Sequence, residues 1–205
     1  MINYLDFIGA CAPDFLPRLG GGASLHITAN WPKDASGQPM LHLISLPGEL
    51  VSKLTGIQVH HAACISVFIP YQQDSIEESI SLARQAGTAQ VLLYQPGTVA
   101  RQEFNLPMEP ARALTIDSDE DVEEEDEFSD EIENKIGGTP TWLQDRIDSG
   151  DMVFCLQLVG PTLVARWPAH RGLFLGGVGY LFLNKTMPEA SFEPIVCGDF
   201  RVQYS

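Results

Sequence analysis

Twelve carboxylates occupy the seventeen positions from Asp117 to Glu133, and no lysine or arginine interrupts them. Such a run attracts cations, speeds encounter with a basic protein and imitates a phosphate backbone. Calcium is a weaker fit, because the run lacks the glycine and the alternating spacing of a calcium-binding loop. A plain linker that keeps the chain soluble is the third interpretation. The residues that would face a partner are Asp117, Asp119, Glu120, Asp121, Glu123, Glu124, Glu125, Asp126 and Glu127.

The negative charge of the protein is concentrated in this run. The 205 residues have a formal net charge of −15. Residues 1–116 hold nine acids and six bases, and residues 134–205 hold six of each, so twelve of the fifteen net charges fall within 117–133. Binding to nucleic acid or to anionic lipid needs clustered lysine and arginine, which the flanking parts lack. The composition therefore favours a basic protein as the partner, with no direct nucleic-acid or membrane binding.

Groups that could catalyse a reaction or bind a metal are scattered along the chain. His60 and His61 are adjacent, but neighbouring side chains on a strand point to opposite faces, so we expect them not to share a metal ion. Cys64 lies in the apolar stretch HAACISVF, which predicts an inert buried thiol. Neither a G-x-S-x-G turn nor a phosphate-binding glycine motif is present. We expect no enzyme activity, no catalytic residue, no metal site and no cofactor.

Aromatic side chains beside arginine are typical anchors of protein interfaces. Trp167, in the segment ARWPAHRGLFLGG, lies outside any strand pattern, and Arg171 follows it closely. We therefore add Trp167 and Arg171 to the predicted partner-binding residues. Trp31 and Trp142 occupy comparable places in the two halves of the chain, and we expect them to fill the core.

The elements that must position these groups are mostly strands. One segment, 74–87, has a helical pattern, because Ile76, Ile80 and Ala83 recur at helical spacing and Gly87 is a typical end. Elsewhere, short runs rich in Val, Ile, Phe and Tyr are bounded by glycine or proline. These runs predict strands at 40–46, 63–69, 89–95, 152–159, 178–184 and 199–205.

Two stretches of the chain, 18–50 and 135–163, share an order of features. Each has a basic residue, an aliphatic residue, Gly-Gly, an aromatic segment, a turn, a strand and a proline. Gly21 aligns with Gly137 and Pro47 with Pro161, at offsets of 116 and 114. This pattern predicts a tandem duplication. The repeats would span about 18–116 and 134–205, joined by a disordered acidic loop at 117–133, within one domain of residues 1–205.

The two Gly-Gly stretches resemble the YwqG-like family, a bacterial domain of unknown function. The first half resembles it through Gly21-Gly22, Trp31-Pro32, Gly37 with Pro39, and the strand from Met40 to Leu46. The strand LHLISL departs from the alanine- and glutamine-rich strand usual in the family, and the final strand lacks the family's frequent cysteine. The second half is similar through Lys135, Gly137, Gly138, Pro140, Trp142 and Gln144.

This resemblance implies an α+β fold with an internally duplicated, largely antiparallel β-sheet and few helices. Some members of the family lie beside toxin genes, which implies an immunity protein that binds a co-encoded antibacterial toxin, such as a secreted nuclease, and occludes its active site. The alternative is a housekeeping module that binds a small ligand or another protein. The sequence has no basic signal segment, no run long enough for a membrane helix and no paired cysteines. We expect a cytoplasmic protein with reduced thiols.

Overall fold

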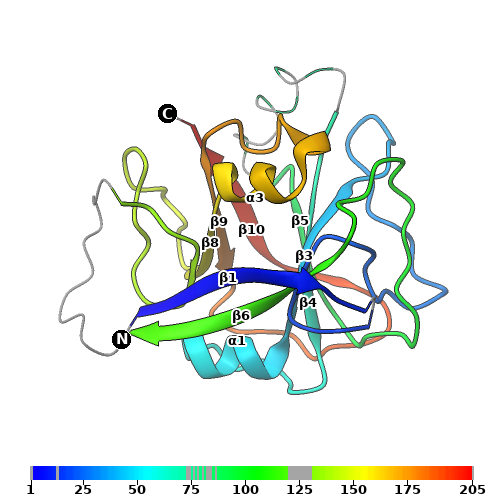
Figure 1. Ribbon diagram of the computed structural model, residues 1–205. Coiled ribbons are helices and arrows are strands. Elements are labelled where there is room, and N and C mark those ends of the chain that lie inside the picture. Colours follow the sequence, from blue (N-terminus) through cyan, green and yellow to red (C-terminus); the bar gives the residue numbers. More distant parts are fainter. Residues whose placement is uncertain are drawn as a thin grey trace.

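Ten β-strands form one closed barrel (Figure 1) in which neighbouring strands are antiparallel. The computed structural model describes residues 2–12, 14–72, 75, 77, 79, 81, 85, 87–119 and 131–204. The strands are β1 (Ile2–Ala10), β2 (Arg18–Leu19), β3 (Leu41–Pro47), β4 (Cys64–Ile69), β5 (Gln90–Tyr94), β6 (Arg112–Asp119), β7 (Lys135–Ile136), β8 (Val153–Val159), β9 (Val178–Leu183) and β10 (Ile195–Gln203).

The strand order around the barrel is β1-β6-β2-β3-β4-β5-β10-β9-β8-β7, and the pairing of Tyr4 with Lys135 closes it. The described part of the chain adds two α-helices, α1 (Gly48–Thr55) and α3 (Gly160–Arg166), and a 3₁₀ turn, η1 (Pro168–His170). The mostly antiparallel sheet with few helices agrees with the expected α+β class. No helix among these residues is long and apolar enough to cross a membrane.

All six strands predicted from the sequence are present within one to four residues at their ends. β1, β6, the two-residue strands β2 and β7, and both helices were not predicted. The expected helix at 74–87 falls largely on residues outside the described part, including Ile76, Ile80 and Ala83. β6 also corrects a boundary, because it continues to Asp119 and turns the start of the expected loop into strand.

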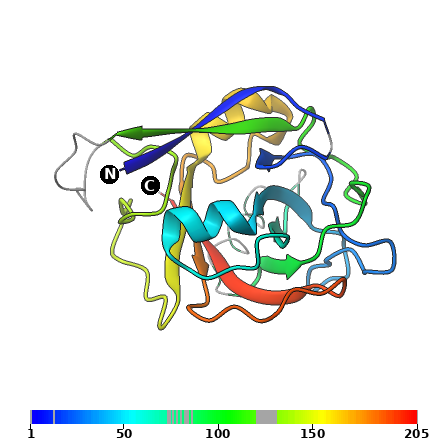
Figure 2. The same ribbon diagram turned by 90° about the horizontal axis from the view of Figure 1, so that it is seen from below.

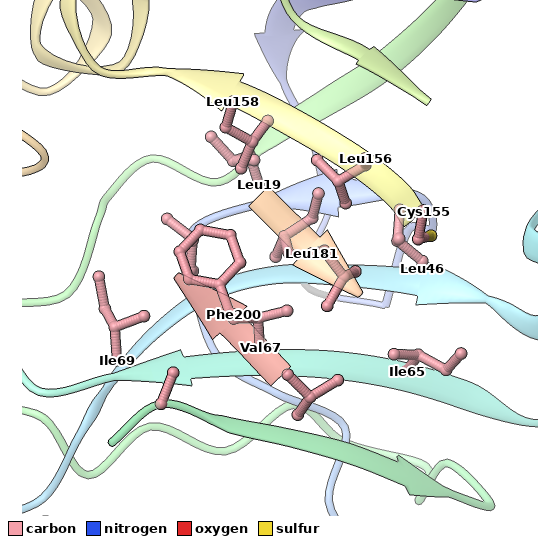
Figure 3. Close-up of a cluster of buried hydrophobic side chains, with 14 of the residues drawn as sticks. Leu19, Leu46, Ile65, Val67, Ile69, Cys155, Leu156, Leu158, Leu181 and Phe200 are labelled. Atoms are coloured by element: carbon pink, nitrogen blue, oxygen red, sulfur yellow. The ribbon is translucent and has the colours of Figure 1, made fainter. Parts of the chain in front are cut away.

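Every strand contributes apolar side chains to the interior of the barrel. They come from the inward-facing positions, because side chains alternate between the two faces of a strand. In Figure 3, Leu46, Val67, Leu181 and Phe200 converge from β3, β4, β9 and β10. Each of them is at most 1% exposed. Two smaller buried clusters lie outside this core, one around Trp31 and one around Trp142. Both tryptophans are buried, as predicted, but on the outer side of the barrel wall and not in its interior.

Each helix begins directly at the end of a strand, and a glycine makes the transition possible. The amide of Gly48 donates to the carbonyl of Ala63, and that of Gly160 to the carbonyl of Gly177, both at 2.8 Å. A Cβ at Gly48 would collide with the carbonyl of His60, and one at Gly160 with the carbonyl of Gly177. Both helices are therefore held against the loop that leads into the next strand.

β1 and β6 run side by side along one side of the molecule, with α3 above them and α1 below them in the view of Figure 1. Their ladder extends from Ile2 opposite Asp119 to Ala10 opposite Arg112. Figure 2 shows the same pair along the upper edge of the molecule, with the N-terminus beside the end of β6. The start of the acidic run is thereby fixed to the first strand of the chain.

Candidate functional site

A chain of buried polar side chains crosses the outer face of β3, β4 and β5. His42 Nδ1 lies 3.1 Å from the carbonyl of Gly21, and its Nε2 lies 2.9 Å from Ser45 Oγ. Ser45 Oγ lies 2.6 Å from Ser66 Oγ, which lies 2.7 Å from the hydroxyl of Tyr94. Because a carbonyl only accepts, Nδ1 carries the proton and Nε2 accepts from Ser45. The donors then run in one direction, from Tyr94 to Ser66, to Ser45 and to His42.

This His42 chain contains a serine within hydrogen-bond distance of a histidine, which is the pairing used by nucleophilic enzymes. Its surroundings prevent that chemistry. His42, Ser45, Ser66 and Tyr94 are all fully buried. Burial lowers the pKa of His42 to about 3 and, with help from nearby Arg18, keeps the imidazole neutral. A base with that pKa and no access to substrate serves to hold the strands together.

Arg18 lies beside the same chain and is also fully buried. Its guanidinium donates to the carbonyl of Phe15 at 2.9 Å and to the carbonyl of Gly22. Burial lowers the pKa of Arg18 relative to its usual value. The guanidinium therefore anchors the turn that follows β2.

The second half of the barrel has a polar cluster in the corresponding place. Lys135 Nζ lies 3.2 Å from Thr141 Oγ1, and Gln157 Oε1 accepts from the amide of Thr141 at 2.9 Å. The hydroxyl of Tyr180 donates to the carbonyl of Thr141 and accepts from the amide of Leu143, at 2.8 and 3.0 Å. These bonds hold the 137–152 loop over the barrel.

An acidic groove lies on the described surface beside β1 and β6. Its volume is about 760 Å³, and none of its lining residues is a lysine or arginine. Asp6 and Asp117 are exposed on the outer faces of β1 and β6, and Glu133 is exposed on the opposite wall. The complete lining is Tyr4, Leu5, Asp6, Asp117, Ser118, Asp119, Ile132, Glu133, Asn134 and Thr162.

The groove has a fixed frame. Asn134 Oδ1 accepts from the amide of Val159 at 2.7 Å, and its Nδ2 donates to Thr162 Oγ1 at 3.1 Å. The carbonyl of Asn134 accepts from the amide of Leu5 at 2.8 Å. Because one residue ties β1 to the start of α3, the carboxylates are presented by a preformed surface. Several carboxylates on one such surface attract cationic groups.

The predicted partner-binding residues lie in different parts of the molecule. Asp117 and Asp119 line the acidic groove. Arg171 is exposed beyond η1. The remaining predicted carboxylates lie outside the described residues, namely Glu120, Asp121, Glu123, Glu124, Glu125, Asp126 and Glu127.

Trp167 is not an exposed anchor, so that prediction is wrong. Only 2% of the residue is exposed, and its Nε1 donates to the carbonyl of Pro110 at 3.1 Å. The cation near its ring is the guanidinium of Arg112, 5.7 Å from the ring centroid, and not Arg171. The turn after α3 folds Trp167 into the barrel core, which a linear pattern cannot reveal.

The expectation about the histidine pair is also corrected. His60 and His61 lie before β4, with a turn at residues 61–62, and are exposed. Their rings lie against each other, with centroids 4.5 Å apart and planes tilted by 33°, because a turn does not alternate faces as a strand does. No group of three or more potential metal ligands is present in the part of the chain that the structure describes.

The four cysteines are free thiols, as expected. Cys64, Cys155 and Cys197 are buried, and burial raises the pKa of each thiol, which disfavours the reactive thiolate. The residues that sequence reasoning missed are Asp6, Asn134 and His42, and Glu133 lies in the acidic run but was not among the predicted partner-binding residues. The alternation in β1 could have placed Asp6 on an outer face, but nothing in the sequence joins it to Glu133.

No protein-family model matches the chain, and no curated protein is significantly similar to it. The geometry of the acidic groove is therefore the basis for a functional assignment.

Proposed function

We propose that this protein is a non-catalytic binding protein whose acidic groove recognises a positively charged surface on another protein. The observation that carries the proposal is the groove itself, which collects Asp6, Asp117, Asp119 and Glu133 without a basic residue in its lining. Complementary charge speeds encounter and selects the partner. The predicted acidic run begins at this groove, with Asp117 and Asp119 in its lining.

The resemblance of the sequence to the YwqG-like family suggests which class of protein the partner belongs to. Under this proposal the partner is a co-encoded antibacterial toxin with a basic active-site surface, and the protein acts as its immunity protein in the cytoplasm. A nuclease fits because its substrate-binding surface is basic, and carboxylates in series imitate a phosphate backbone.

We also infer that the barrel arose from two copies of one unit, as the family resemblance implies. β2-β3-α1-β4-β5 and β7-β8-α3-β9-β10 follow the same order, and their strands lie in mirrored order around the barrel. Arg18 pairs with Ser45, and Lys135 pairs with Gln157. The equivalent of Pro47 is then Val159, because Gly48 and Gly160 both begin a helix.

Further support comes from two matching turns. Gly20 and Gly137 follow β2 and β7 with φ angles of 72° and 74°. The amide of Gly20 donates to the carbonyl of Leu43, and that of Gly137 to the carbonyl of Cys155, both at 2.7 Å. β3 and β8 are each irregular at this acceptor residue. This shared detail supports the inferred duplication.

A second candidate function is the binding of a small neutral ligand, as the housekeeping alternative implies. One pocket of about 450 Å³ favours it, because Tyr71 and Phe104 form an aromatic wall and Gln38 and Asn105 add amide groups. Pockets of this size and make-up hold small ligands in other proteins. Such a ligand would bind independently of the acidic groove.

Co-expression with the protein encoded next to this chain tests the leading proposal. Rescue of growth and co-purification are expected if the neighbour is a toxin. The informative variant neutralises the groove with Asp6→Asn, Asp117→Asn, Asp119→Asn and Glu133→Gln. We expect its affinity for the partner to fall at least about tenfold at low salt and the salt dependence to flatten, since screened Coulomb attraction is removed.

A matched control removes the same charge from exposed acids elsewhere, by Glu49→Gln, Asp145→Asn, Glu189→Gln and Glu193→Gln. The control is expected to keep its affinity within about twofold, since distant charges are screened. Equal losses in both variants would contradict a role of the groove and reduce the effect to net charge. A neighbour that is harmless and does not co-purify would contradict the immunity role.

A further inference from the structure

The closed barrel leaves part of one strand without a partner on one edge. β6 spans eight residues, and β1 pairs with its whole length. On the other edge β2 is only two residues long and pairs with Arg112 and Ala113. Among the described residues, no strand continues the sheet beyond this point, so the edge of β6 from Thr115 to Ser118 is open.

The backbone direction identifies the groups on that edge. The amide of Leu114 donates to the carbonyl of Pro17 at 3.1 Å, on the side away from β1. Backbone groups alternate sides along a strand. The N–H and C=O groups of Ile116 and Ser118 therefore point away from β1 as well. Neither residue forms a backbone hydrogen bond on that side with any described residue.

The edge lacks most of the devices that usually protect an open strand. Natural edge strands carry charged side chains, especially lysine, or a proline or a bulge that prevents pairing with another chain. The segment from Thr115 to Ser118 has no lysine, proline or bulge, and its one charged side chain, Asp117, disfavours an acidic strand but not a basic one. Thr115, Asp117 and Ser118 are exposed, while Ile116 packs against the barrel core. The strand is thus held by β1 on one edge and by the packing of Ile116 against the core, and its other edge is open.

The charge beside the edge selects the occupant. Asp117 projects from the outer face of β6 and Asp6 from that of β1, and both line the acidic groove. An added strand would place every second side chain on that same outer face, next to Asp117. A segment with lysine or arginine at alternate positions satisfies both the backbone groups and the carboxylates.

We propose that the edge of β6 from Thr115 to Ser118 binds an extended, basic segment of the partner protein by β-strand addition. The inference rests on the proposed function and specifies how that partner docks. Main-chain hydrogen bonds to Ile116 and Ser118 supply the geometry of the complex, and the carboxylates supply its charge preference. An acidic surface acting through side chains alone would leave these backbone groups unused.

The test uses the full-length protein and a short acetylated peptide that alternates lysine with valine. We expect amide hydrogen exchange at Ile116 and Ser118 to slow about tenfold or more when the peptide is bound, since hydrogen-bonded amides exchange only on opening. The variant Ser118→Pro removes an N–H that points away from β1. Proline is tolerated at such edge positions, because no hydrogen bond to the neighbouring strand is lost. The variant is expected to lose at least about tenfold in affinity, since a ladder bond to the peptide is lost and the ring blocks approach.

Ser118→Ala is the matched control, because it keeps the N–H and removes only the hydroxyl that donates to Asn3 Oδ1. Its affinity should stay within about threefold of the parent protein, since that hydroxyl bond lies within the chain and touches no partner. A second probe leaves the protein unchanged. N-methylation of the peptide at alternate residues is expected to abolish binding when it blocks the edge that faces β6 and not when it blocks the other edge.

The outcomes separate this inference from the proposed function. Binding that leaves exchange at Ile116 and Ser118 unchanged, and that tolerates both N-methylated peptides, overturns strand addition and leaves the acidic groove as the recognition surface. Binding that needs the Ser118 amide and yet survives neutralisation of the groove overturns the proposed function and leaves strand addition.

Discussion

The two halves of the barrel bury polar groups on the outer face of their strands, but with different side chains. Each half has a buried cation at the start of its first strand and a tryptophan that covers the outer face of its sheet. In the first half Arg18 lies beside a histidine and hydroxyl chain that is fully buried. In the second half Lys135 lies beside amides that hold the loop backbone.

The difference shows which features the scaffold requires. The turns at Gly20 and Gly137, the irregular strands after them and the glycines that begin both helices have the same geometry. The polar side chains between them differ in type but are hydrogen-bonded in both halves, because a buried polar group without a partner is costly. The two halves share these features of backbone geometry and differ in their polar side chains.

The largest expected effect tests whether the two turns are equivalent. Gly20→Ala and Gly137→Ala each place a Cβ against a backbone carbonyl, that of Met108 or Leu54, at a positive φ. We expect each to lower the free energy of unfolding by about 3 kcal/mol, combining strain with steric conflict. Urea denaturation measures both. A tolerated alanine at one turn would break the equivalence.

The next effect is the dependence of the free energy of unfolding on pH, and we expect it to come from His42 in the first half. His42 has a pKa of about 3 in the folded protein against 6.5 for the free side chain. The unfolded chain therefore takes up a proton that the folded chain does not, and stability is complete above about pH 6.5 and falls as the pH is lowered towards 3. The slope approaches about 1.4 kcal/mol per pH unit.

Replacing His42 by the residue at its equivalent position tests this directly. That residue is Phe154, which pairs with Phe182 as His42 pairs with Phe68. The variant His42→Phe is expected to flatten the acid slope measured by denaturation at a series of pH values. Part of the slope should remain, because burial also lowers the pKa of His170. An unchanged slope would show that His42 is protonated in the folded state.

A smaller effect separates the two buried tyrosines. Tyr180→Phe removes a hydroxyl that donates to the carbonyl of Thr141 and accepts from the amide of Leu143, so the loop loses two hydrogen bonds, although the amide of Leu143 keeps Gln203 Oε1 as an acceptor at 3.1 Å. We expect a loss of about 2 kcal/mol. Tyr94→Phe affects only Ser66 in the described network, and we expect about 1 kcal/mol. Thermal unfolding compares the two, and the reverse order would contradict this account of the second half.

The smallest effect on folding belongs to the acidic groove, which lies on β1 and β6, outside the strands shared by the two halves. Neutralising Asp6 and Asp117 should change the free energy of unfolding by less than about 0.5 kcal/mol, because both side chains are exposed. A large destabilisation in urea would mean that the carboxylates support the fold and are not reserved for a partner.

The sequence predicted the elements that carry a strong local signal. Six strands, the burial of Trp31 and Trp142, and the free thiols follow from apolar patterns that are visible within a few residues. The acidic stretch and its concentration of charge were equally visible. The prediction for Trp167 failed because its partner, the carbonyl of Pro110, is distant in sequence, and that for the histidine pair failed because residues 61–62 form a turn where a strand was expected.

Local patterns determined that this chain forms a β-rich fold, since alternation and turn residues act over short distances. Only the tertiary structure decided that β1 and β6 close the barrel, because their pairing joins residues more than a hundred positions apart. That pairing places Asp6 opposite Thr115, diagonal to Asp117 on the same outer face, and leaves one edge of β6 open. The candidate site is therefore a product of long-range strand register, which no single segment of the sequence encodes.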